Sequence, residues 1–203
     1  MPIRDVLIVG AGPSGLATAI AAKQQGLDYV IVEKGVLVNS IFNFPMHMVF
    51  FTTPELLEIG QLPLTTPYDK PTRLEALRYY RRVVDTYELP ISFHEEVVTI
   101  EPPSSPVIPE QASPSHGSYS GGADLVRSAD DAVFVVTTKD QRGTMRVREA
   151  RAVVLAIGYY DLPNYLGVPG EDLPHVSHYY SDAHPYYRRR VVVVGGKNSA
   201  AEA

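Results

Sequence analysis

The chain has 203 residues, a hydrophobic share of 45% and a formal net charge of −5 at pH 7. This charge argues against a nucleic-acid partner, which needs a basic surface, and no apolar run approaches the ~20 residues of a membrane span. Cysteine is absent, so these residues cannot carry a redox disulfide or a thiolate metal site. The chain enters a strand almost at once, without a cationic and apolar leader, which predicts a cytoplasmic protein.

The N-terminal segment shows the order strand, glycine loop, helix, strand and acid. An apolar run over 5–9 predicts the first strand, and three glycines follow it with the spacing G-x-G-x-x-G: Gly10, Gly12 and Gly15. An Ala-rich helix is expected over 16–25, with Gly26 at its C-cap. A second strand is expected over 29–32 and ends at Glu33. This arrangement predicts a dinucleotide-binding βαβ unit.

Each part of the motif has a physical task. Gly10 allows the tight turn, Gly12 lets the backbone approach a pyrophosphate, and Gly15 allows close packing of helix and strand. The helix N-terminus attracts phosphate, and Glu33 can accept hydrogen bonds from ribose hydroxyls. A glycine-rich turn without a ligand is the alternative. The N-terminal position of the motif, together with Pro13, favours FAD over NAD.

The next segment is expected to support this site. His47 and Phe50 lie in the expected flavin region, as flavin contacts or as core residues. An amphipathic helix is expected over 72–87, because Thr72 and Glu75 form a capping-box sequence. Its expected apolar stripe consists of Leu74, Leu77, Tyr80 and Val84. Its arginines form either a docking face for an acidic partner or, more simply, a solvated face.

The middle of the chain changes character. Residues 102–131 are rich in Pro, Ser and Gly without a hydrophobic period, which predicts a flexible insertion. A β-meander is expected after it, with strands over 132–138 and 144–147, and another strand over 152–157. That strand ends at Gly158, where a residue without a side chain would let the chain pass close to a cofactor.

A second glycine loop lies near the end of the sequence. It follows a predicted strand over 190–194 and consists of Gly195, Gly196, Lys197, Asn198, Ser199 and Ala200. Lys197 replaces the second glycine of the motif and Ala200 stands for the third, yet the context predicts an NAD(P)H site. The histidines before it, His175, His178 and His184, match no compact ligand spacing, so no metal site is expected.

The expected fold is α/β: a Rossmann-like FAD-binding domain with an inserted antiparallel β-meander, followed by the start of a second Rossmann-like NAD(P)-binding domain. The expected domains are 1–164 and 165–203. A helix of one turn after the second loop is not stable alone. The second domain is therefore expected to be truncated, and the sequence to be a fragment of a longer chain.

The chain resembles the thioredoxin-reductase-like flavoproteins with two dinucleotide sites, and within them the bacillithiol-disulfide reductases of the YpdA type. The resemblance rests on VGAGPSGL at 9–16, EKGVLVNSIFNFP at 33–45, FFTTPELLEIG at 50–60, GYYDLPNYLGVPGEDLP at 158–174, HPYY at 184–187 and VGGKNSA at 194–200. It implies FAD in the first domain and NADPH in the second, with a homodimer as a family expectation.

The resemblance also implies site residues. The expected FAD contacts are Gly10, Gly12, Pro13 and Ser14 at the pyrophosphate, Glu33 and Lys34 at the adenosine ribose, Val98 at the adenine, and Asn39, Ser40 and Asn43 at the flavin. The expected contacts with the nicotinamide nucleotide are Gly195, Gly196, Asn198 and Ser199. No catalytic acid or base is assigned.

The chain differs from its expected relatives at two places where they carry cysteines, which restricts the reactions expected of it. Thioredoxin reductases carry a C-x-x-C pair before the second glycine loop, where residues 175–189 have no cysteine. YpdA-type relatives often carry a cysteine where this chain has Ser14, and a hydroxyl cannot attack a disulfide as a thiolate does. The expected function is electron transfer from NAD(P)H through FAD to a small disulfide or a redox protein. A ferredoxin-type NADP reductase and a non-catalytic FAD-binding module are the alternatives.

Overall fold

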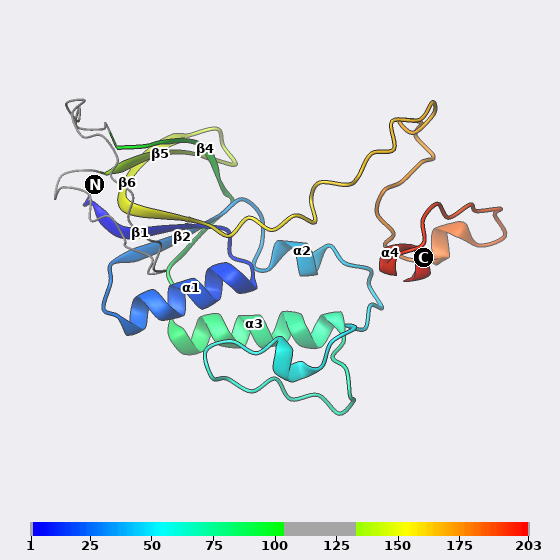
Figure 1. The fold of residues 1–203 in the computed structure, drawn as a ribbon, viewed down its shortest axis with the longest axis horizontal. Coiled ribbons are helices and arrows are strands. Elements are labelled where there is room, and N and C mark those ends of the chain that lie inside the picture. Colours follow the sequence, from blue (N-terminus) through cyan, green and yellow to red (C-terminus); the bar gives the residue numbers. More distant parts are fainter. Residues whose placement is uncertain (1, 104–132, 203) are drawn as a thin grey trace, which may run out of the picture.

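The computed structural model describes residues 2–103 and 133–202 (Figure 1). Its elements are β1 (Arg4–Val9), α1 (Pro13–Gln24), β2 (Tyr29–Glu33), α2 (Asn39–Phe42), the 3-10 helix η1 (Pro54–Leu56), α3 (Arg73–Tyr87), β3 (Ile91–Phe93), β4 (Glu95–Glu101), β5 (Phe134–Asp140), β6 (Met145–Leu155), η2 (His184–Tyr186) and α4 (Asn198–Glu202). Almost all of the insertion predicted over 102–131 lies outside the described residues. Within the described ranges, no helix has the length and apolar character to cross a membrane.

One mixed sheet organises the fold. Its six strands have the order β3-β2-β1-β6-β5-β4. The neighbours from β3 to β6 run parallel, whereas β5 and β4 continue the sheet as an antiparallel meander. The α/β sheet with an added meander is therefore confirmed. The helix α1 connects β1 to its parallel neighbour β2, as the glycine motif predicts.

The strand β6 corrects one expectation. Two separate strands over 144–147 and 152–157 are predicted, but the structure has a single strand over Met145–Leu155. Its first half pairs with β5 and its second half with β1, and Ala150 has a partner in both strands. In each half, the backbone N–H and C=O groups are hydrogen-bonded to a neighbouring strand, so the strand continues without interruption.

Helices and meander cover opposite faces of the parallel strands. Figure 1 shows α1 and α3 on one side, while β4, β5 and β6 curl over the other. Successive side chains of a strand point to opposite faces, so Ile8 and Ile31 pack in the cluster with the helices. Leu7 and Val32 pack with Val136 of the meander. The strands are buried on both faces, as continuous apolar runs predict.

The helix α3 begins with the predicted capping box. The hydroxyl of Thr72 accepts a hydrogen bond from the backbone N–H of Glu75 at 3.3 Å, and the Glu75 carboxylate accepts one from the backbone N–H of Thr72 at 2.7 Å. These reciprocal bonds satisfy backbone N–H groups that the first helical turn leaves without partners.

The buried face of α3 differs from the predicted stripe. The buried residues are Ala76, Tyr79, Tyr80 and Val83. Of the predicted stripe, Tyr80 is buried and Leu77 and Val84 pack partly buried against the core, whereas Leu74 is 49% exposed. Tyr79 is buried because its hydroxyl has partners: it accepts a hydrogen bond from the backbone N–H of Ile59 at 2.7 Å, and its one proton lies between the backbone oxygens of Leu62 and Ile59 at 3.0 and 3.1 Å. A tyrosine can be buried when its hydroxyl has a hydrogen-bond partner. The predicted apolar stripe did not include Tyr79.

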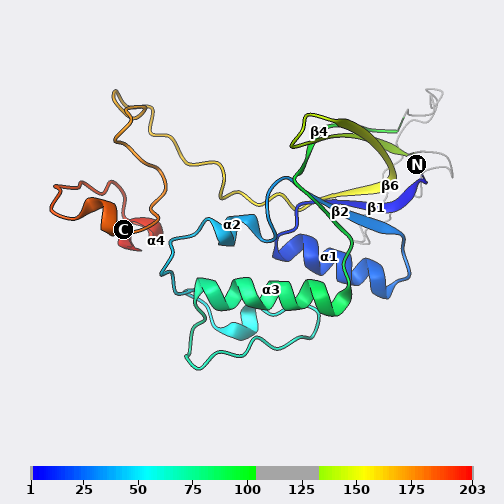
Figure 2. The same ribbon diagram turned by 180° about the vertical axis from the view of Figure 1, so that it is seen from behind.

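Residues after β6 leave the body of the molecule as an extended arm, which Figure 2 shows from behind. The strand predicted over 190–194 is wrong, because this segment has no regular structure. Val192 is 85% exposed and Val194 is 74% exposed. A strand needs a neighbour for its backbone groups, and within 2–103 and 133–202 no strand pairs with this segment.

A hydrogen-bonded loop within the arm should open only in strong acid. The pKa of the Glu171 carboxyl is lowered from 4.5 to about 2, first by its hydrogen bond with His178 and then by the backbone N–H groups of Leu166 and Gly167. A lowered pKa means that the stabilisation is present above the ordinary pKa and is lost as the pH falls through the folded value. We expect the NMR amide signals of Leu166 and Gly167 to titrate near pH 2. Titration near 4.5, as for a free glutamate, would contradict this.

Candidate functional site

A cavity of about 880 Å³ opens at the carboxyl ends of the parallel strands. Its wall includes Val9 at the end of β1, Glu33 at the end of β2 and Leu155 at the end of β6. Open α/β sheets bind their ligands at this edge. The size lies in the upper part of the range for ligand pockets, about 300–1,000 Å³.

The three glycines of the first loop have different surroundings. Gly10 has a φ of +105°, and a Cβ there would lie 2.4 Å from the backbone oxygen of Ala156. A Cβ on Gly15 would lie 1.9 Å from the backbone oxygen of Gly10. At Gly12, by contrast, no described atom lies within 4 Å of an added Cβ. Gly10 and Gly15 are therefore needed by the protein itself, whereas Gly12 leaves open space at the cavity.

The N-terminus of α1 lies at the same wall. Gly12 is the N-cap, Pro13 opens the helix, and no side chain caps it. Both residues and Ser14 line the cavity. Free backbone N–H groups and the positive end of the helix dipole therefore lie beside the space that Gly12 leaves open.

The buried carboxylate of Glu33 closes the loop onto β2. One of its oxygens accepts a hydrogen bond from the backbone N–H of Ala11 at 2.7 Å, and the other accepts one from the N–H of Gly35 at 2.7 Å. Each carboxylate oxygen has a second lone pair. Glu33 can thus hold the glycine loop and still accept a hydrogen bond from a hydroxyl in the cavity, which it lines.

An ion pair spans the cavity wall next to Glu33. Lys34 Nζ lies 2.6 Å from Asp161 Oδ2, which joins the tip of β2 to the segment after β6. The hydrogen bond with Asp161 raises the pKa of Lys34 above 10.5 and outweighs the opposing effect of partial burial. Lys34 was predicted at this site, whereas Asp161 was not, although it lies within the resembling stretch at 158–174.

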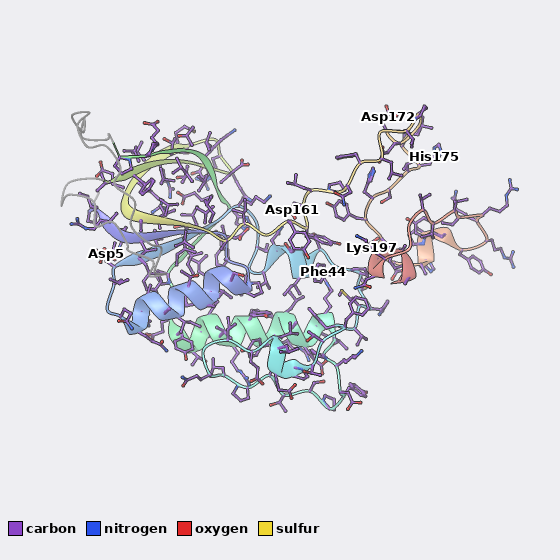
Figure 3. The ribbon with its side chains drawn as sticks, in the orientation of Figure 1. Asp5, Phe44, Asp161, Asp172, His175 and Lys197 are labelled. Carbon is purple, nitrogen blue, oxygen red and sulfur yellow. The ribbon has the colours of Figure 1, made fainter. Side chains whose placement is uncertain are left out.

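Aromatic rings form another part of the wall. The rings of Phe44 and Phe50 lie 6.1 Å apart, and those of Phe44 and Tyr160 lie 4.8 Å apart, both edge to face. The Tyr160 hydroxyl donates to the backbone oxygen of Asn43, and the Tyr179 hydroxyl donates to that of Tyr160. Figure 3 marks Phe44 and Asp161 where the arm leaves the body of the molecule. Phe50 packs in the core, which was one of its two expected roles, and it also lines the cavity.

Glu95 is a buried acid of the cavity that the sequence did not single out. Its oxygens accept hydrogen bonds from Arg148 Nε and Nη2, each at 2.8 Å, and from the Thr138 hydroxyl. Burial alone would raise the pKa of Glu95, but the bonds from Arg148 and Thr138 outweigh it and hold that pKa below its ordinary value. Glu95 is therefore an anion fixed to the meander.

The structure brings most of the expected FAD contacts together. Those that line the cavity are Gly10, Gly12, Pro13, Ser14, Glu33, Lys34, Asn39, Ser40 and Gly158. Gly15 lies behind the wall in packing contact. Asn43 lies outside the lining and donates a side-chain hydrogen bond to the backbone oxygen of Asn39. Val98 is half exposed, and its neighbour Val97 lines the cavity instead.

The second glycine loop lies apart from this cavity. None of its candidate residues is part of the lining: Gly195, Gly196, Asn198, Ser199 and Ala200. The helix that follows, α4, has five residues. Across the described ranges, no group of three His, Cys, Asp or Glu side chains has the arrangement of a metal site.

Several lining residues were not predicted as site residues: Leu56, Leu57, Ile59, Tyr80, Glu96 and Val97. Leu57 lies in the loop before α3, and this loop folds back over the helix. There the Tyr80 hydroxyl donates a hydrogen bond to the backbone oxygen of Leu57. Burial raises the pKa of the Tyr80 hydroxyl well above its ordinary value. Successive side chains of a strand point to opposite faces, so known bounds for β4 would have shown that Val97 and Val98 face opposite sides.

Comparison with known proteins identifies the family of the chain. The family model for pyridine nucleotide-disulphide oxidoreductases matches residues 7–108 and 124–203. Bacilliredoxin reductase Bdr of Bacillus subtilis (strain 168) is 40% identical over 197 residues, which are 97% of this chain and 51% of the relative. A ferredoxin–NADP reductase of Ignicoccus hospitalis is 23% identical over 200 residues, 98% of this chain and 51% of the relative.

Two solved structures are similar over the whole chain. Bacillithiol disulfide reductase Bdr (YpdA) from Bacillus cereus superposes with a TM-score of 0.83 at 38% identity, covering 100% of this chain and 54% of that protein. The enzyme of the same name from Staphylococcus aureus gives 0.80 at 38% identity, covering 100% and 53%. The chain spans about half the length of these relatives. It belongs to the pyridine nucleotide-disulphide oxidoreductase family.

Proposed function

We propose that the cavity binds FAD, and that the whole protein passes electrons from NADPH through the flavin to a small disulfide. The observation that carries the proposal is the open space at Gly12, enclosed by the N-terminus of α1 and the carboxylate of Glu33. A pyrophosphate and a ribose need these two kinds of group side by side. The relatives named as bacilliredoxin and bacillithiol disulfide reductases support the choice of acceptor.

The residues present fit the cofactor from end to end. Gly12, Pro13 and Ser14 would face its pyrophosphate, Glu33 and Lys34 its adenosine ribose, the backbone of Val97 its adenine, and Asn39, Ser40 and Phe44 its flavin. FAD, when bound, supplies the two-electron chemistry between nicotinamide and acceptor. The protein's part is to hold the ring system between apolar walls and to keep water from it.

The second glycine loop is the proposed NADPH site. Gly195, Gly196, Asn198, Ser199 and Ala200 would face the nucleotide, in a domain that begins near residue 165. The balanced reaction is NADPH, a proton and one disulfide giving NADP⁺ and two thiols. Ser14 lines the cavity where a thiol is expected in relatives, so the disulfide would receive electrons without a thiolate from these residues. A cytoplasmic homodimer remains part of the proposal.

Two other functions remain as alternatives. The similarity to a ferredoxin–NADP reductase supports a protein electron carrier as the acceptor. A non-catalytic FAD-binding module would have the same cavity without a working nicotinamide site. Reduction of the bound flavin by NADPH separates the module from both enzymes, and steady-state oxidation of NADPH with each acceptor separates the two enzymes from each other.

Replacing Gly12 with alanine should weaken FAD binding without destabilising the fold. The backbone at Gly12 has a φ of −78° and a ψ of 176°, which alanine adopts freely, and the added methyl group would enter the cavity. We expect FAD affinity to fall by at least about tenfold, or 1.4 kcal/mol, with an unchanged unfolding midpoint of the apoprotein. Fluorescence titration with FAD and thermal unfolding measure the two quantities.

The same substitution at Gly196 is the matched control. An added Cβ there also meets no described atom within 4 Å, but Gly196 lies outside the cavity. FAD affinity should be unchanged in Gly196→Ala. Equal affinities in the Gly12→Ala variant and the unaltered protein would contradict FAD binding in this cavity.

A further inference from the structure

The ion pair of Lys34 and Asp161 joins two sides of the cavity across the end of β1. Val9, at the end of β1, is level with Val32 of β2 on one side and with Leu155 of β6 on the other. Because neighbouring strands lie about 4.8 Å apart, β2 and β6 are roughly 10 Å from each other. The ion pair bridges this gap, since Lys34 follows β2 and Asp161 follows β6.

Other hydrogen bonds hold Asp161 in this place. It lies in a turn that the backbone N–H of Leu162 closes by donating to the backbone oxygen of Tyr159 at 3.3 Å. The hydroxyl of the preceding Tyr160 donates to the backbone oxygen of Asn43 at 3.3 Å and thereby ties the turn to the body of the molecule. The carboxylate of Asp161 is therefore presented to the cavity by a turn that is fixed in itself and at its neighbour.

Among the described residues that line the cavity, Lys34 is the one cation. Its ammonium group lies 2.6 Å from Asp161, whereas the carboxylates of Glu33 and Glu96 act on it more weakly. The side chain of Lys34 is 55% exposed and that of Asp161 is 35% exposed. Because solvent screens an ion pair with this exposure, the pair can open while the sheet stays folded.

We propose that Lys34 and Asp161 form a clasp that retains the bound cofactor, with Asp161 as the positioning residue that holds the Lys34 ammonium group across the cavity. The hydrogen bonds that join β2 to β1 and β1 to β6 form a closed ring with the ion pair, and the start of the glycine loop lies at its base. Of these links, the ion pair is the one that can open without breaking the sheet. The inference rests on the proposed function, because the retained molecule is the FAD of this cavity.

The exchange of FAD by the full-length protein tests the clasp. Release is measured by chasing radiolabelled FAD with unlabelled FAD, and uptake is measured by stopped-flow flavin fluorescence with the apoprotein. In Asp161→Asn we expect both rate constants to rise by about fivefold, the upper value for a partly exposed ion pair, because an open clasp obstructs neither entry nor exit. The Kd, which is the ratio of the two rate constants, should therefore change less than either of them.

Two further variants separate the clasp from other effects of the substitution. Asp161→Glu keeps the carboxylate, and its exchange should be slow, as in the unaltered protein. Asp172→Asn removes the same charge from an exposed position of the arm outside the cavity, which Figure 3 marks, and it should leave both rate constants unchanged.

Unchanged rate constants in Asp161→Asn would overturn the inference. Faster release without faster uptake would also overturn it, since Asp161 would then stabilise the bound state without obstructing entry. Equally fast exchange in Asp161→Glu and Asp161→Asn would show that the carboxylate is not what holds the clasp closed. Absence of bound FAD in the unaltered protein would instead reject the proposed function.

Discussion

Replacement of Arg148 by methionine is expected to lower the free energy of unfolding by about 3–5 kcal/mol, the cost of leaving one member of a buried ion pair without its partner. Arg148 is 14% exposed and donates two hydrogen bonds at 2.8 Å to Glu95, which is 3% exposed, and a third at 3.2 Å to the hydroxyl of Ser92. Methionine keeps an apolar side chain of similar length, so the loss in unfolding free energy would measure the effect of removing the guanidinium group. Urea unfolding followed by circular dichroism at pH 7 measures the change.

Arg146 offers a control on the same strand. Arg146 Nη1 lies 3.8 Å from Glu95, but the side chain is 46% exposed and also faces Asp140 at 3.5 Å. Solvent screens such a pair, and Arg146→Met should cost less than about 1 kcal/mol. Equal losses in the two variants would show that Glu95 does not depend on its bidentate partner.

The Arg148 effect should also depend on pH in a defined direction. Burial opposes the charge of Glu95, but Arg148 and Thr138 hold its pKa below the ordinary value of 4.5. The stabilisation is therefore complete above pH 4.5 and is lost as the pH falls through the lowered pKa. The difference in stability between Arg148→Met and the unaltered protein should shrink in acid. A difference that grows as the pH falls below 4.5 would contradict this.

Replacement of Gly15 by alanine is expected to destabilise the protein by about 3 kcal/mol or more, the upper range for overpacking. The added Cβ would lie 1.9 Å from the backbone oxygen of Gly10 and 3.4 Å from the Cβ of Ala156. Gly10 is held in place by β2, because its backbone N–H donates to the backbone oxygen of Val32 at 2.8 Å. Thermal unfolding of the apoprotein measures the loss. Gly12→Ala is the control, since it adds the same methyl group to open space, and equal midpoints would refute the packing role of Gly15.

The first βαβ unit follows from the sequence because its determinants are local. The glycine spacing, the apolar strands and the acid at Glu33 lie within 30 residues of one another, and each is a requirement of backbone geometry. The same holds for the capping box of Thr72 and Glu75, whose partners are three residues apart. These elements occur where the patterns predict them, apart from shifts of a few residues at their ends.

The remaining differences all depend on distant partners. The buried face of α3 is set by Tyr79, whose hydroxyl reaches the loop at Ile59. The continuity of β6 depends on two different neighbouring strands. The valines over 191–194 have strand composition without a partner strand among the described elements. Lys34 meets Asp161, and Glu95 meets Arg148, only after the sheet has formed.

The most direct test of the central claim is the visible spectrum of the purified full-length protein before and after anaerobic NADPH. The proposal predicts a bound flavin whose absorbance is bleached by NADPH, and whose colour returns when bacillithiol disulfide is added. A bound flavin whose absorbance does not change with NADPH or NADH would favour the non-catalytic FAD-binding module instead. No flavin at all, even after FAD is supplied, would contradict the assignment of the cavity.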